Sequence, residues 1–202
     1  MKDGYEVVAV NCWSEVNKNM KDTLSVFWKT LLLIHNTQEF NEIVRFLKNF
    51  SNDKKIVYIS LTKTNEVIVP YFNKIKSRIF VVDCASTMLF EKKNTESCFF
   101  EDPPSNLNEM IKLLDKYIDK LNPDLIIIDS ISHFIDFSSV SPSESKKLLD
   151  FLNYFKDIKH SASRRFVMLF EETSRKELRC LPTYYVDLII RLEVIIDKIS
   201  WG

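Results

Sequence analysis

The stretch DLIIIDSISHFI, residues Asp124–Ile135, decides the fold class of this chain. Its run of four apolar residues, Leu125–Ile128, shows no alternation, which is typical of a strand buried on both faces of a parallel sheet. Asp129 follows at once, and then come the small polar residues Ser130 and Ser132. In parallel α/β sheets, ligands bind at the edge where the strands end. The stretch therefore predicts a buried strand that places a carboxylate at a ligand-binding edge.

Other apolar runs alternate with segments of helical periodicity along the chain. Strands are predicted at residues 30–36, 55–61, 78–86, 164–172 and 184–196, and helices within 37–53, 65–76, 103–123 and 141–161. This order predicts an α/β domain of three layers, with a mostly parallel sheet covered by helices on both faces. At 202 residues we expect a single domain, 1–202, with its core at about 30–193 and an N-terminal extension at 1–29.

Two segments carry more specific expectations. The inward face of the helix at 65–76 is predicted to consist of Val67, Ile68, Tyr71, Phe72 and Ile75. The polar segment Glu91–Glu101 has the composition of a surface loop, so Phe99 and Phe100 are candidates for an exposed anchor that binds a partner. The alternative left open is that both rings fold back beneath the loop.

Composition narrows the class of protein. The chain has 28 basic and 28 acidic residues, so it has no net charge that would attract nucleic acid or an anionic membrane. No apolar run approaches the ~20 residues of a membrane span, and the first residues lack the apolar core of a signal peptide, so we expect a cytoplasmic protein. The four cysteines are widely spaced, which argues against a zinc site or a disulfide framework.

Glycine is almost absent from the sequence. The two glycines are Gly4 and Gly202. The loops G-x-x-x-x-G-K-[ST] and G-x-G-x-x-G both need glycine where the backbone approaches phosphate closely. The sequence therefore excludes both of these nucleotide-binding loops.

The order of the motifs resembles the RecA/KaiC-type ATPase core over about Thr30–Glu193. LLLIHN, KIVYIS, LIIIDSIS, FVMLFEE and VDLIIRLE follow one another as the strands of that family do. The succession VVDCAS, PPSNLNEM and IIIDSISHFI is also similar to archaeal KaiC-like proteins that lack the phosphate loop. The resemblance implies a RecA-like fold in which Asp129 is the Walker B aspartate, the residue that holds the water shell of a magnesium ion.

The segment HNTQEFNE, His35–Glu42, departs from the phosphate loop of that family. It has no glycine and no lysine, Glu39 and Glu42 would repel a triphosphate, and Phe40 fills space that the loop leaves open. After the second strand, SLTKTNE retains only Glu66 as an acidic residue that could activate water. ATP hydrolysis needs phosphate clamping, magnesium coordination and water activation together. We therefore expect no catalysis, and the degenerate nucleotide site would consist of His35, Asn36, Thr37, Gln38 and Asp129.

Asp83, at the end of its own strand, and Asp129 are the candidate metal ligands. If their strands are adjacent, the two carboxylates converge on one edge and can bind a divalent ion. The alternative is a structural role, in which each carboxylate accepts hydrogen bonds from the following turn, for Asp129 the turn Ser130–Ser132. Glu171 and Glu172 would complete the acidic edge or be solvated.

A nucleophile with a histidine base is a further candidate site. His35 and His133 lie near strand ends, with Ser130, Ser132 or Cys84 as the nucleophile. The G-x-S-x-G elbow that would support such chemistry is absent from the sequence.

Basic residues gather in the last third of the chain, at Arg164, Arg165, Arg175, Lys176 and Arg179. RecA-type folds use this edge and its loops for nucleic acid or for a neighbouring subunit. The resemblance therefore makes Arg175 and Arg179 candidates for partner binding, and the alternative is a solvated rim.

These residues favour a non-catalytic RecA/KaiC-like domain that acts in a regulatory role through protein binding or oligomeric assembly, without a cofactor. Two alternatives stay open. One is an atypical protein that binds Mg-ATP through Asp129 and the helix N-terminus near Thr37. The other is a nucleic-acid-associated accessory subunit.

Overall fold

The computed structural model describes residues 24, 28–35, 40–73, 75–88, 93–137, 141–157, 164–172 and 182–192. The strands are β1 Thr30–His35, β2 Lys55–Ser60, β3 Arg78–Asp83, β4 Cys98–Phe100, β5 Leu125–Asp129, β6 Arg165–Glu171 and β7 Leu188–Leu192. The longer helices are α2 Phe40–Ser51, α3 Asn65–Phe72, α4 Leu107–Leu121 and α5 Pro142–Asp157. Two short 3₁₀ helices are η1 Ser86–Met88 and η2 Ile131–His133.

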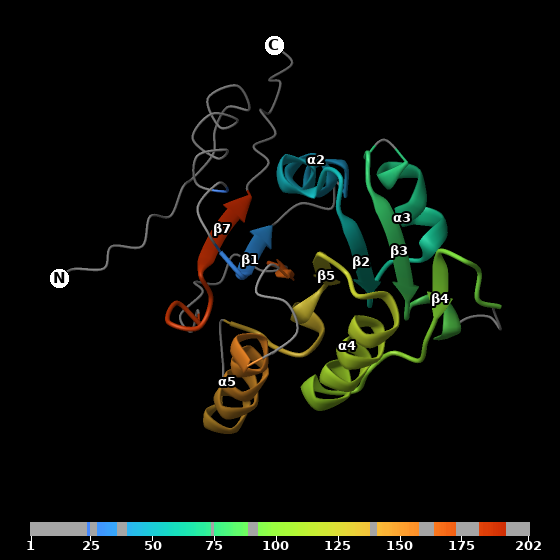
Figure 1. Ribbon diagram of the computed structural model, residues 1–202. Helices are drawn as coiled ribbons and strands as arrows, with labels where there is room; N and C mark the ends of the chain where they lie inside the picture. The colour runs from blue at the N-terminus through green and yellow to red at the C-terminus, as the bar shows by residue number, and fades with distance from the viewer. Residues whose placement is uncertain are drawn as a thin grey trace, which may run out of the picture.

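The strands form one parallel sheet in the order β4-β3-β2-β5-β6-β1-β7. Side chains of α4 and α5 pack into the core on one face of the sheet, and those of α2 and α3 pack into the core on the other (Figure 1). The predicted three-layer α/β fold is therefore confirmed. No helix in the described ranges is long and apolar enough to cross a membrane.

The central strands are buried along their whole length, which explains their uninterrupted apolar sequences. β1 and β5 have no exposed residue, and alternate side chains of β5 enter the two opposite cores. Burial of each Leu or Ile side chain contributes roughly 1.5–3 kcal/mol. The same apolar run therefore both defines the strand and holds the two helical layers together.

Helix α3 is shorter than the sequence predicts, and its inward face is narrower. It ends at Phe72, and Val67 is 46% exposed although it was expected to face inward. Ile68 and Phe72 are buried. Successive helix residues are 100° apart, so a contact centred on Ile68 and Phe72 leaves Val67 on the flank. Pro70 lies inside the helix.

The segment expected to be a surface loop, Glu91–Glu101, contains the edge strand β4. Phe99 is 6% exposed, and its ring packs on those of Phe80 and Tyr117, with centroids 6.4 and 5.3 Å apart. Phe100 is half-buried. The expectation of an exposed anchor is therefore wrong for Phe99, because pairing with β3 turns its ring into the core.

The outer edge of β4 is closed by the loop that precedes it. The backbone N–H of Cys98 donates to Thr95 Oγ1 at 3.0 Å, and that of Phe100 donates to Asn94 Oδ1 at 2.7 Å. The amide of Thr95 in turn donates to the carbonyl of Cys98 at 2.8 Å. Side chains thus satisfy the amides that an edge strand otherwise presents to solvent.

Arg164 precedes β6 and Arg165 is its first residue, so both lie where the parallel strands begin. Asp129 lies where the strands end, on the opposite side of the sheet. Arg164 is buried and donates to the carbonyl of Pro123 at 2.8 Å and to Asn122 Oδ1 at 2.7 Å. The guanidinium of Arg165 lies over the ring of Trp28. The two arginines are therefore not part of a basic cluster at the ligand-binding edge. Arg175, Lys176 and Arg179 lie outside the described residues.

Candidate functional site

The strands end in register and place polar residues along one edge of the sheet. Asp83 is the Cα partner of Ser60, Ser60 is the partner of Asp129, and farther along the sheet His35 is the partner of Glu171. This is the edge at which the sequence predicts a site, and Asp129 lies in its middle.

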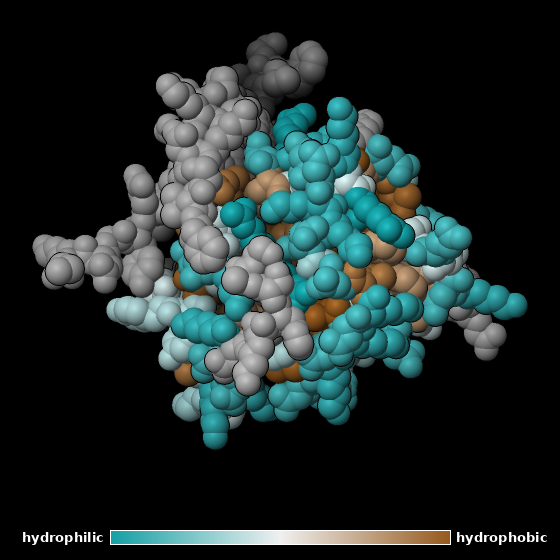
Figure 2. Space-filling view, viewed as in Figure 1, coloured by the Kyte–Doolittle hydropathy of each residue, from teal (hydrophilic) through white to brown (hydrophobic). Residues whose placement is uncertain are grey.

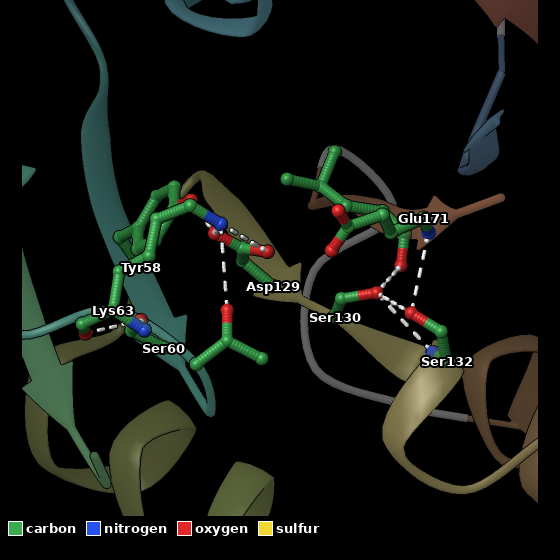
Figure 3. A network of polar contacts seen from close by, with 9 residues as sticks. Tyr58, Ser60, Lys63, Asp129, Ser130, Ser132 and Glu171 are labelled. Atoms are coloured by element: carbon green, nitrogen blue, oxygen red, sulfur yellow. Dashed lines mark hydrogen bonds and ion pairs between the residues drawn. The ribbon is translucent and has the colours of Figure 1, made fainter. Parts of the chain in front are cut away.

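The carboxylate of Asp129 is buried and has two donors from the β2 side. The hydroxyl of Tyr58 donates to Oδ2 at 2.5 Å, and the ammonium of Lys63 lies 3.1 Å from Oδ2 and 3.5 Å from Oδ1. Figure 3 shows both side chains converging on Asp129. Burial, and then the charge of Asp129, raise the pKa of Tyr58 well above its usual value, so Tyr58 stays a hydrogen-bond donor.

The turn after β2 fixes the position of Lys63. The hydroxyl of Ser60 donates to the carbonyl of Lys63 at 2.6 Å and accepts from its amide at 3.0 Å. The ammonium lies 5.5 Å from the ring centroid of Phe40, the first residue of α2. Phe40 is buried and makes edge contacts with the rings of Tyr58 and Tyr71. Lys63 is thus held against both an aromatic ring and a carboxylate.

The turn after Asp129 is capped by Ser130 and not by the aspartate. The Asp129–Ser130 peptide bond is cis. The hydroxyl of Ser130 donates to the carbonyl of Leu169 at 2.9 Å and accepts from the amide of Ser132 at 3.2 Å. The two serine hydroxyls also contact each other, and Ser132 Oγ accepts from the amide of Glu171 (Figure 3). The expectation that the Asp129 carboxylate caps this turn is therefore wrong, because that carboxylate faces β2.

Asp83 has the structural role that was one of its two alternatives. Its carboxylate accepts from the amides of Asn65, Ala85 and Ser86 at 2.7–3.0 Å and from the hydroxyl of Ser86 at 2.6 Å. Asp83 is fully buried at the end of β3, and the amide of Asn65 belongs to the first residue of α3. These four donors satisfy the carboxylate and join the end of β3 to α3.

The two candidate metal ligands do not end adjacent strands. β2 lies between β3 and β5, so Ser60 separates Asp83 from Asp129, and two strand spacings amount to about 10 Å. No group of three or more His, Cys, Asp or Glu residues in the described ranges could hold a metal ion. Magnesium requires near-octahedral oxygen coordination at about 2.1 Å. The oxygens of Asp129 instead accept from a hydroxyl and an ammonium, so the residues present do not fit this ion.

The remaining candidates are distributed as follows. His35 is buried in β1, whereas Asn36, Thr37 and Gln38 lie outside the described residues, so their part in nucleotide binding stays a prediction.

Burial, followed by the charges of Glu101, Asp83 and Asp102, raises the pKa of Cys84 to about 12. Such a thiol is not an activated nucleophile.

The position of Glu172 after a strand suggested a solvated side chain, but the structure shows otherwise. Its buried carboxylate forms an ion pair with Arg191 of β7 at 2.5 Å. The sequence interpretation missed this pair, and it also missed the roles of Tyr58 and Lys63 at Asp129. Lys63 stands in the short polar turn SLTKTNE, which carries no sequence signal for this contact.

No family model and no curated protein matches the sequence. Among solved structures, the chain is similar to a KaiC-like protein from the hyperthermophilic archaeon Pyrococcus horikoshii OT3, with a TM-score of 0.50 and 13% sequence identity. The similarity covers 85% of this chain and 74% of that chain. At this identity the likeness shows the fold, and the chain has a RecA/KaiC-like fold.

Proposed function

We propose that this RecA-like domain neither binds nor hydrolyses Mg-ATP and acts in a regulatory role by binding proteins, either other partners or further copies of itself. The observation that carries the first part is the ion pair between Lys63 and Asp129. It neutralises the carboxylate that a RecA-type ATPase would use to position magnesium.

The three requirements of ATP hydrolysis support the same conclusion. The segment after β1 has neither glycine nor lysine, and the buried ring of Phe40 stands at the start of α2. The Asp129 carboxylate is occupied by protein donors. Glu66 is exposed in the first turn of α3. Phosphate clamping, metal coordination and water activation are all needed. The first and the third lack their usual residues, and the second retains Asp129 with its carboxylate occupied.

A binding role is supported by the apolar surface around α3. Val67 and Val69 are 46% and 38% exposed. A cavity of about 270 Å³ lies beside Val69. Its lining combines the apolar Val69, Phe72 and Ile79 with the polar Asn73, Ser77 and Ser97. In Figure 2, brown side chains gather on the right-hand side of the molecule, where α3 and β4 lie in Figure 1. Exposed apolar patches of this kind are common at protein–protein contacts.

The experiment for the first part is a thermal unfolding scan of the wild-type chain with millimolar Mg-ATP, with Mg²⁺ alone as the control. We expect equal Tm values, because a ligand raises Tm only when it binds the native state. A Tm that rises by about 5 °C with Mg-ATP, and not with Mg²⁺ alone, would contradict the proposal and favour the atypical ATP-binding alternative.

Light scattering and sedimentation over a range of concentrations test the second part. Self-association through the α3 surface should appear as a mass that increases with concentration and that Val67→Asp with Val69→Asp lowers. Lys76→Asp, a charge change at an exposed position close to α3, is the matched control. A mass that does not respond to the α3 substitutions would exclude this surface as the site of self-association.

A further inference from the structure

Three oxygens surround the Lys63 ammonium. Asp129 Oδ2 and Oδ1 lie 3.1 and 3.5 Å from Nζ, and Thr62 Oγ1 lies 3.4 Å from it. An ammonium has three N–H donors, and carboxylate and hydroxyl oxygens are also the ligands that hard divalent cations prefer. The Lys63 ammonium thus lies among oxygen atoms of the kind that would also bind a divalent cation.

Contacts with neighbouring residues hold the Lys63 backbone and its ammonium in place. The Ser60 hydroxyl ties the backbone of Lys63 at both its N–H and its carbonyl. The Phe40 ring lies 5.5 Å from the ammonium, at a distance typical of a cation–π contact. The Tyr58 hydroxyl also donates to Oδ2 of the same carboxylate. Neighbouring side chains of the fold therefore keep cation and anion together.

The carboxylate needs a counter-charge because it is buried. Asp129 has a side-chain exposure of 1%, whereas that of Lys63 is 23%. An isolated buried carboxylate is strongly unfavourable, and a paired cation offsets that cost. In a RecA-type ATPase the charge at this strand end would come from a metal ion that binds reversibly. Here it comes from Lys63, in the turn that follows the adjacent strand β2.

We infer that Lys63 is a resident cation that takes the place of the divalent metal at Asp129, and that its removal opens a divalent-cation site. The inference rests on the proposed function, since it assigns the cause of the lost metal chemistry to one side chain. Lys63→Ala removes the ammonium and its stem, so the oxygens of Asp129 and Thr62 become available to a metal ion and its waters.

The test is a titration with Mn²⁺ alone, followed by electron paramagnetic resonance of the free ion and by thermal unfolding. Wild type should bind no Mn²⁺ at this site. Lys63→Ala should bind one ion, and its Tm should rise by about 5 °C or more at a concentration 100-fold above Kd. Lys63→Arg keeps the charge and should behave as wild type. Lys63→Ala with Asp129→Asn should lose the Mn²⁺ response.

Two results would overturn the inference. One is a folded Lys63→Ala protein that binds no more Mn²⁺ than wild type. A Lys63→Ala protein that is unfolded without metal and does not regain the native circular dichroism spectrum when Mn²⁺ is added counts as the same result. The other is Mn²⁺ binding by wild type that Asp129→Asn abolishes. This test is separable from that of the proposed function. Mg-ATP binding by wild type would overturn the proposed function, whereas a Lys63→Ala protein without Mn²⁺ affinity would overturn only the inference about Lys63.

Discussion

The ammonium of Lys63 lies 3.1 Å from Oδ2 of Asp129, across the ends of the adjacent strands β2 and β5. The two residues are 66 positions apart in the sequence. In the proposed function this pair stands in place of the metal ion of a RecA-type ATPase, because the carboxylate and its counter-charge both come from the chain. Its consequences for stability and for chemistry can each be measured.

Replacing the lysine should destabilise the fold strongly. Lys63→Met leaves the buried Asp129 carboxylate without its cation, so we expect the free energy of unfolding to fall by about 3 kcal/mol, as for other broken buried pairs. Urea unfolding monitored by circular dichroism measures the loss. Adding Asp129→Asn to Lys63→Met should recover part of it, because no buried charge is then left uncompensated.

The exposed pair Glu42–Arg45 provides the matched control. The side chain of Arg45 is 59% exposed, and the two groups are 3.1 Å apart. Arg45→Met should cost less than about 1 kcal/mol, as is usual for surface ion pairs. Equal losses for Lys63→Met and Arg45→Met would show that Lys63 and Asp129 do not form a buried pair.

Stability should fall above pH 10, and Tyr58 should account for a measurable part of the fall. Because the pKa of Tyr58 is raised in the folded state, its contribution to stability is complete below the unfolded value of about 10 and is lost as pH rises towards the folded value. Each such group contributes a slope of about 1.4 kcal/mol per pH unit. Urea midpoints between pH 9 and 11 should therefore decline less steeply in Tyr58→Phe. The same slope in both proteins would contradict a buried neutral phenol.

Cys84 should resist alkylation in the native protein. Burial, with the nearby carboxylates, raises the pKa of its thiol to about 12. At pH 8 the reactive thiolate is then about one part in ten thousand. Iodoacetamide labelling followed by peptide mass spectrometry should modify Cys84 in urea and leave it unmodified in buffer. Rapid labelling in buffer would instead support the role of nucleophile that the sequence left open.

Phe99 should behave as a core residue. Its ring contacts Phe80 and Tyr117, and the Lys120 ammonium lies 3.9 Å from its centroid. Phe99→Ala should therefore lower the free energy of unfolding by about 3 kcal/mol. Tyr184→Ala, at a residue that is 82% exposed, is the comparison and should have an effect within about 0.5 kcal/mol. A stable Phe99→Ala protein that had lost only partner binding would restore the anchor hypothesis.

Most of the sheet could be predicted from the sequence, because its strands are long apolar runs with distinct ends. The run Leu125–Ile128 is buried on both faces, as its lack of alternation predicts. Strand β4 could not be predicted in the same way. Its three residues lie in a polar segment, are too few to show a period, and form a strand only because β3 offers a free edge.

The site could be predicted only in part, because its contacts depend on the order of strands in the sheet. Asp129 at a sheet edge follows from the local pattern alone. The contact with Lys63 requires β2 beside β5, and the separation from Asp83 requires β2 between β3 and β5. The pattern of apolar residues within one strand does not reveal the order of the strands in the sheet. A lysine in a short polar turn is also typical of a solvated side chain, so SLTKTNE did not indicate a contact with a buried carboxylate.

The closed outer edge of β4 limits how this domain can join other chains. Strand addition, in which a foreign segment extends a sheet, needs unpaired amides, and those of Cys98 and Phe100 already donate to Thr95 and Asn94. Two copies of the chain therefore cannot merge their sheets at β4 without first peeling away that loop. Recruitment on this side has to proceed through side-chain recognition, and newly made chains are protected there against fusing into a continuous aggregate.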